Sequence, residues 1–259
     1  MRLSWNLGRV AGIDLFLHPS ALLVYFLVAG AMPDMLGTIA LGAALLGSIV
    51  LHELGHALMA RRYGIRTADI TLYLFGGVAR LERMPRSAGP ELLITLAGPA
   101  VNFAIVLVLS AVIGLAELIG LSLPVIVPMV LSMNLVLGVF NLLPIFPMDG
   151  GRVLRALLSG WMGRVRATEV AALLGRVLAV VGGTIFLLNG MFLQLILPLF
   201  VFVAASMELR QVQAEGRPGG FTNVPPPPAG FRWASGGDGV LRLVPIMVHV
   251  QSGRDRSWG

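Results

Sequence analysis

Hydrophobic residues fall into six long runs, and short polar segments separate one run from the next. Each run is long enough for an α-helix to cross the hydrocarbon core of a bilayer, which takes roughly 20 residues. The predicted spans are residues 15–32, 36–60, 91–117, 125–146, 168–188 and 191–207. The pattern predicts an all-α polytopic membrane protein with about six transmembrane helices.

Composition agrees with this fold class. Hydrophobic residues make up 56% of the chain and charged residues 12%, whereas soluble domains carry about 25% charged residues. The formal net charge of +6 would suit a nucleic-acid binder, but the basic residues are all arginine and lie in short segments between apolar runs. We therefore expect a lipid bilayer as partner and no nucleic acid. The absence of cysteine excludes disulfides and thiolate metal sites.

Arginine positions orient the predicted spans. The arginine-rich segments 61–90 and 149–166 are expected on the cytoplasmic side, and both termini with them. Residues 1–208 are predicted to form the membrane-embedded domain. Residues 209–259 are rich in glycine and proline, which predicts a flexible cytoplasmic tail with at most one strand, in residues 240–250.

The second predicted span carries the sequence His52-Glu53-Leu54-Gly55-His56. Histidines four residues apart lie on one face of a helix, where two imidazoles can hold a metal ion. Glu53 is rotated by about 100° around the helix and can reach a water on that metal. The alternative is a helix whose histidines only bond to neighbouring spans, but ionisable groups buried in lipid are costly without a function.

A third candidate ligand follows the fourth predicted span. Pro144 and Pro147 break that helix, and Asp149 comes directly after the break at the same cytoplasmic depth as the histidines. A carboxylate is a common third ligand beside two histidines, although Asp149 could instead cap the following helix. Asn141 precedes the break, where its amide can support substrate or an oxyanion, or can pack between spans. For Asn102 we favour the packing role.

Residues 72–81 surround a glycine pair and have the composition of strands. They predict a small β-hairpin at the membrane interface, and an unwound substrate could add to its edge. The alternative is a loop whose aromatic residues only anchor it to the interface.

Together these motifs resemble the site-2 protease family of intramembrane zinc metalloproteases, peptidase family M50. The resemblance rests on HELGH in a membrane span and on the later Asn-x-x-Pro-x-x-Pro-x-Asp-Gly, and it covers roughly residues 6 to 208. Three shorter stretches agree with it: Gly12-Ile13 with His18-Pro19-Ser20, Phe75-Gly76-Gly77, and Ala97-Gly98-Pro99 with Asn102. The chain resembles a minimal form without PDZ or CBS domains.

The resemblance implies one Zn²⁺ per chain, held by His52, His56 and Asp149, with Glu53 activating the zinc-bound water and Asn141 supporting substrate. It implies an endopeptidase in the bacterial cell membrane that cleaves transmembrane segments. Implied substrates are anti-sigma factors, pro-sigma factors or signal-peptide remnants. The alternatives are a non-proteolytic zinc transporter and a substrate-holding pseudoprotease, and the intact Glu53 argues against a degenerate site.

Overall fold

The computed structural model describes residues 4–73, 76–82, 85, 87–216, 227–228, 231–235 and 241–245. The chain divides into two compact units, Met1–Gly216 and Arg217–Gly259. The elements of the first unit are β1 (Trp5–Val10), β2 (Ile13–Leu17), η1 (Pro19–Leu23), α1 (Val24–Leu27), α2 (Met35–Arg62), β3 (Thr67–Tyr73), β4 (Gly76–Leu81), α3 (Ala88–Leu118), α4 (Ile126–Asn141), α5 (Asp149–Met162), α6 (Arg164–Leu188), η2 (Phe192–Leu195) and α7 (Ile196–Gly216).

Four helical stretches in the described part of the chain are long and apolar enough to cross a membrane. They are α2, α3, α6 and the continuous stretch Phe192–Ala214 of η2 and α7. Large apolar side chains remain exposed along α3, α6 and α7, as expected of helices that contact lipid. A shorter apolar helix, α4, corresponds to the fourth predicted span. It ends at Asn141 because Pro144 and Pro147 cannot continue it.

The prediction of a helical span over residues 15–32 is wrong. The segment begins in strand β2, continues as the 3₁₀ helix η1, and has only one helical turn in α1. Two local features break it. Pro19 starts η1, with His18 as the N-cap that accepts from Ser20 N, and Gly30 has a φ of 79°. The predicted number of six helical spans is therefore not confirmed by the described residues, which contain four candidate spans.

A four-stranded sheet lies against α2, in the order β1-β2-β3-β4. The predicted hairpin is present as the antiparallel pair β3–β4, with Tyr73 opposite Gly76. The parallel pairing of β2 with β3 brings the N-terminal strands beside it, which the sequence did not predict. The shared core of the sheet, η1 and α2 contains Ile13, Leu15, Ala21, Ile49, Ala57, Ile70 and Leu72.

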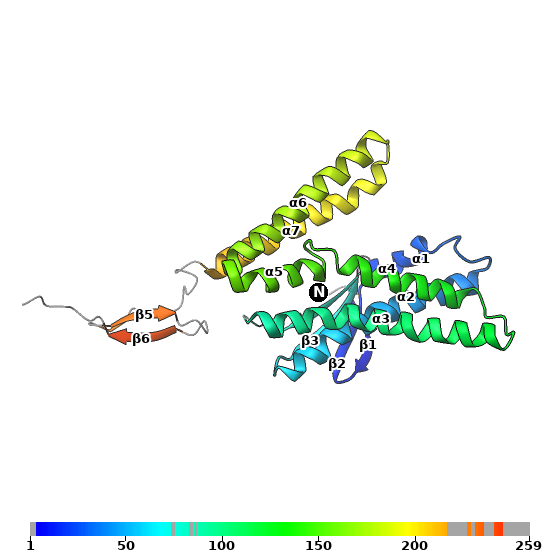
Figure 1. The fold of residues 1–259 in the computed structure, drawn as a ribbon, viewed down its shortest axis with the longest axis horizontal. Helices are drawn as coiled ribbons and strands as arrows, with labels where there is room; N and C mark the ends of the chain where they lie inside the picture. The colour runs from blue at the N-terminus through cyan, green and yellow to red at the C-terminus, as the bar shows by residue number, and fades with distance from the viewer. Residues whose placement is uncertain are drawn as a thin grey trace, which may run out of the picture. The chain divides into compact units, whose positions relative to one another are not determined.

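The remaining helices of the first unit extend this framework (Figure 1). Helix α3 packs against α2, α4 and α5, while α6 and α7 form an antiparallel pair that packs on α5 through α6. The second unit contains the antiparallel strands β5 (Phe231–Ser235) and β6 (Leu241–Pro245). Strand β6 lies in the predicted region, and β5 was not predicted. The predicted flexibility of the tail concerns residues largely outside the described ones.

Candidate metal centre

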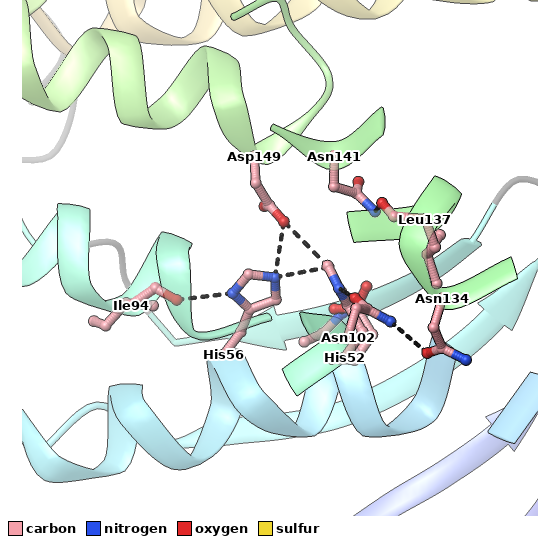
Figure 2. Close-up of polar contacts among 10 residues, drawn as sticks. His52, His56, Ile94, Asn102, Asn134, Leu137, Asn141 and Asp149 are labelled. Carbon is pink, nitrogen blue, oxygen red and sulfur yellow. Dashed lines mark hydrogen bonds and ion pairs between the residues drawn. The ribbon is translucent and has the colours of Figure 1, made fainter. Parts of the chain in front are cut away.

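Three side chains meet at one point between α2 and α5 (Figure 2). The Nε2 atoms of His52 and His56 lie 3.1 Å apart, and Asp149 Oδ2 lies 3.1 Å from each of them. Ligands of a tetrahedral metal ion with bonds of 2.0–2.2 Å are separated by roughly 3.3 Å. The three atoms, which belong to the three predicted ligand residues, therefore fit around a single metal ion.

Local structure explains how Asp149 reaches the histidines. Gly150 and Gly151 pack so closely on the preceding loop that an added Cβ would lie 2.2 Å from Leu143 O and 2.6 Å from Ile145 C, respectively. These two glycines let the chain turn sharply from the proline break into α5. The N-cap of α5 is Met148, and no side chain caps this helix. The alternative interpretation of Asp149 as a helix cap is therefore wrong.

The carboxyl group of Asp149 is buried against both imidazoles. Burial by itself would raise its pKa, but a protonated imidazole at His56, assisted by His52, lowers the pKa below the usual range. Only 13% of the Asp149 side chain is exposed. The donor set of the centre is thus two imidazole nitrogens and one carboxylate oxygen, which suits a zinc-like divalent ion.

Each histidine is oriented through its other ring nitrogen. His56 Nδ1 donates to the carbonyl oxygen of Ile94 at 2.8 Å, and this oxygen can only accept. His52 Nδ1 lies 2.5 Å from Asn102 Oδ1 and donates to it. When the rings are neutral, as metal ligation requires, each proton then sits on Nδ1 and both Nε2 lone pairs face the centre. Such outer contacts fix the tautomer that a metal requires.

The contact between His52 and Asn102 continues into a buried chain of hydrogen bonds. Asn102 Nδ2 donates to Asn134 Oδ1 at 3.0 Å, and Asn134 Nδ2 donates to Ser48 Oγ at 3.0 Å. The chain joins α3, α4 and α2. Asn102 therefore does pack between helices as expected, but it also orients His52, which the sequence analysis missed. The sequence could have pointed to Asn134, because its amide lies in the middle of a mostly apolar helix.

Glycine allows α3 to approach the metal-binding face of α2. An added Cβ at Gly98 would lie 2.2 Å from His56 Nε2 and 2.8 Å from His52 Nε2. On α2, a Cβ at Gly55 would lie 2.6 Å from Ala97 O. Any larger residue at Gly98 would occupy the space of the ligand atoms.

Glu53 lies beside the centre without entering the triangle of ligand atoms. Its Oε2 accepts a hydrogen bond from the backbone N–H of Ala79 in β4 at 3.3 Å. Its Cγ lies 2.4 Å from the position of an added Cβ at Gly77. Strand β4 therefore runs directly alongside this carboxylate.

A cavity of about 650 Å³ adjoins the three candidate ligands and Glu53. Its wall includes Glu53, the three candidate ligands, strand β4, and apolar side chains of α2, α4 and α7. Asn141 also lines the cavity, and its Nδ2 donates to Leu137 O one turn back on α4 at 3.0 Å. Figure 2 shows this amide turned toward Leu137, away from the triangle. The cavity can thus bring an extended apolar chain, a bound metal and a carboxylate base together.

The chain is similar in sequence to a known protein family and to individual known proteins. A family model described as peptidase family M50 matches residues 40–121 and 116–182. A zinc metalloprotease of Methanocaldococcus jannaschii is 37% identical over 217 residues, which are 83% of this chain and 63% of that protein. Rip3 of Mycobacterium tuberculosis is 41% identical over 202 residues, 70% of this chain and 50% of that protein. The chain thus spans between half and two thirds of the length of these relatives.

The fold also resembles a solved structure, the site-2 protease from Methanocaldococcus jannaschii. The TM-score is 0.61 at 35% sequence identity, and the match covers 80% of this chain and 95% of that one.

Proposed function

Because the chain belongs to peptidase family M50, we propose that it is a zinc endopeptidase that cleaves membrane-embedded segments of other proteins. The observation that carries this proposal is the triangle of His52, His56 and Asp149 with Glu53 in the same cavity. Three protein ligands with one open position are typical of catalytic zinc, whereas structural zinc sites use four protein ligands.

The residues present fit one zinc ion per chain. His52 and His56 would supply Nε2, and Asp149 would supply Oδ2, from positions already 3.1 Å apart. Zinc bound there would supply a Lewis acid that polarises a peptide carbonyl and acidifies a water molecule. Asn102 and the carbonyl of Ile94 would keep both imidazoles in the ligating tautomer.

Glu53 is the proposed general base. It lies one residue from a ligand and lines the cavity, but it is not one of the three converging groups. In this role it takes a proton from the attacking water and delivers it to the leaving amine. Its present contact with Ala79 N–H, at 3.3 Å, is long for a hydrogen bond. The carboxylate can therefore exchange that partner for water.

Asn141 is proposed to support the substrate. Its amide forms part of the cavity wall near the end of α4, next to the break that leads to Asp149. With one Nδ2 proton used by Leu137 O, the second proton of the same amide can be donated to a substrate carbonyl or a developing oxyanion.

Strand β4 is the proposed docking element for the substrate backbone. It is the last strand of the sheet, and among the described residues only its edge toward β3 is paired. The N–H of Ala79 points from the other edge toward Glu53. A substrate that has unwound from its helix could add to this edge as a strand. Its peptide bonds would then run past the metal centre.

The proposed substrates are transmembrane segments of membrane-anchored proteins. The apolar wall of the cavity suits them, and the family resemblance suggests anti-sigma factors, pro-sigma factors and signal-peptide remnants. The proposed setting is a bacterial cell membrane with both termini in the cytoplasm. Arg61 and Arg62 end α2 one to two turns after His56, which supports a site that opens toward the cytoplasm.

Cleavage can be tested with a library of single-span membrane segments held between two reporter domains, co-expressed with the wild type or with the Glu53→Gln variant. The wild type is expected to separate the reporters for a subset of segments, with new termini inside the apolar stretch. The variant is expected to leave the same segments whole. Identical fragments in both strains, or none in either, would contradict the proposal.

A further inference from the structure

Four charged side chains meet in the protein interior, away from the triangle of ligand atoms. They come from four different helices: Glu91 from α3, Arg155 from α5, Arg164 from α6 and Glu208 from α7. Arg155 and Glu91 are the most buried of them, with 1% of each side chain exposed. We call these four residues the charge cluster. From the sequence, only a role in membrane topology was predicted for its arginines.

The contacts within the charge cluster are short and directional. Arg155 Nε and Nη2 lie 2.8 and 2.6 Å from Glu91 Oε1, and Arg155 Nη1 lies 2.5 Å from Glu208 Oε1. The other oxygen of Glu91 accepts from Arg164 Nη1 at 3.0 Å. Two positive and two negative groups thus balance one another. A buried charge without a partner is strongly unfavourable, so separating these side chains would be costly and they are held in place.

Glu91 belongs to the helix that supports both histidines. One turn after it, the carbonyl of Ile94 holds His56 Nδ1. Two turns after it, Gly98 packs on the Nε2 atoms of both histidines. A shift of α3 at Glu91 would therefore reach His52 and His56 directly.

Arg155 holds the chain on both sides of Asp149. It lies on α5, the helix that begins with Asp149. Its guanidinium group also lies 5.2 Å from the ring centre of Phe146, in the loop that precedes Asp149. The pair of Arg155 with Glu91 therefore connects the segment carrying the third ligand to the helix that supports the first two.

We propose that Arg155 and Glu91 are positioning residues that set the location of Asp149 relative to His52 and His56, and thereby the affinity of the centre for zinc. This inference rests on the proposed zinc site. Arginine is required at residue 155 because its planar group contacts Glu91 and Glu208 at once. A lysine ammonium keeps the charge but not this geometry.

The test compares zinc affinity among Arg155→Lys, Glu91→Gln and the wild type, measured by competition with a chelator. Outer contacts of metal ligands typically change affinity by about 10- to 100-fold, and a loss in this range is expected for both variants. The absorption spectrum of the Co²⁺-substituted protein is expected to change as well. Arg9→Lys is the matched control, because Arg9 forms an ion pair with Asp14 between β1 and β2. It should bind zinc as the wild type does.

A second variant protects the test against misfolding. Arg155→Met combined with Glu91→Gln removes one positive and one negative charge, so the net charge of the cluster stays zero. Arg164 and Glu208 lose their partners, but their side chains are 23% and 24% exposed and can be solvated. This double variant is expected to fold and to bind zinc weakly. Wild-type zinc affinity and Co²⁺ spectrum in any of the folded variants would overturn the inference, and so would failure of all three to fold.

The inference and the proposed function fail in different ways. If the wild type cleaves membrane segments and the variants bind zinc normally, only the positioning role is wrong. If the variants lose zinc affinity but the wild type cleaves nothing, the proposed peptidase activity is wrong and the positioning role stands.

Discussion

His52 Nδ1 lies 2.5 Å from Asn102 Oδ1, at a depth where 5% of His52 and none of Asn102 is exposed. Water cannot replace this contact, so the orientation of the His52 ring depends on a single amide. That amide is itself held by Asn134. The metal site therefore extends into α4, a helix that carries none of the three candidate ligands.

Replacing Asn102 with leucine is expected to weaken zinc binding by about 10- to 100-fold, because His52 loses the acceptor that fixes its tautomer. Chelator competition on the purified protein measures the change. Asn189→Ala is the control, since the Asn189 amide donates to Ile185 O of its own helix at an exposed site. Equal zinc affinity in the Asn102 variant and the wild type would remove Asn102 from the site.

A single methyl group at residue 98 is expected to abolish zinc binding. In Gly98→Ala the new Cβ would lie 2.2 Å from His56 Nε2, closer than any normal contact. Gly114→Ala, on the same helix, meets nothing within 4 Å and should raise stability by about 0.5–1 kcal/mol. Metal analysis and thermal unfolding measure the two effects. One zinc per chain in the Gly98 variant would show that α3 does not pack on the ligands as described.

The same substitution at residue 77 is expected to separate catalysis from metal binding. In Gly77→Ala the new Cβ would lie 2.4 Å from Glu53 Cγ, which displaces the carboxylate but leaves the ligand triangle untouched. We expect full zinc content and a kcat lower by at least about 10-fold, since a general base contributes about 10²–10⁴. The control is Gly47→Ala, which meets nothing within 4 Å. Loss of zinc from the Gly77 variant would contradict the separation.

Removing the residues after Gly216 is expected to leave the peptidase intact, because Met1–Gly216 is a compact unit by itself. The zinc content and the cleavage rate of the truncated protein, relative to the full chain, measure this. A truncated protein that no longer folds would show that the tail is part of the membrane domain.

The sequence predicts what depends on local spacing. HELGH sets two imidazoles on one helical face whatever surrounds them, and the two prolines before Asp149 mark the break that turns it inward. A common depth for both motifs was predicted from the neighbouring arginines. From these features we could predict that the three candidate ligands and Glu53 lie close together.

Features that depend on distant pairing were missed. Residues 15–32 are apolar enough for a span, but they begin in strand β2. That strand pairs with β1 and also with β3, which lies more than fifty residues later in the chain. The burial of Arg155 follows from four helices that meet around it. Nothing in its local sequence separates it from an arginine at the membrane surface.

The most direct measurement is the cleavage rate of purified Glu53→Gln against a membrane segment that the wild type cleaves, with zinc per chain determined on the same samples. Glutamine keeps the size of the side chain but cannot take a proton. We predict about one zinc per chain in both proteins, as three ligands in one centre imply, and no detectable cleavage by the variant. Cleavage at the wild-type rate by a fully zinc-loaded Glu53→Gln protein would contradict the account.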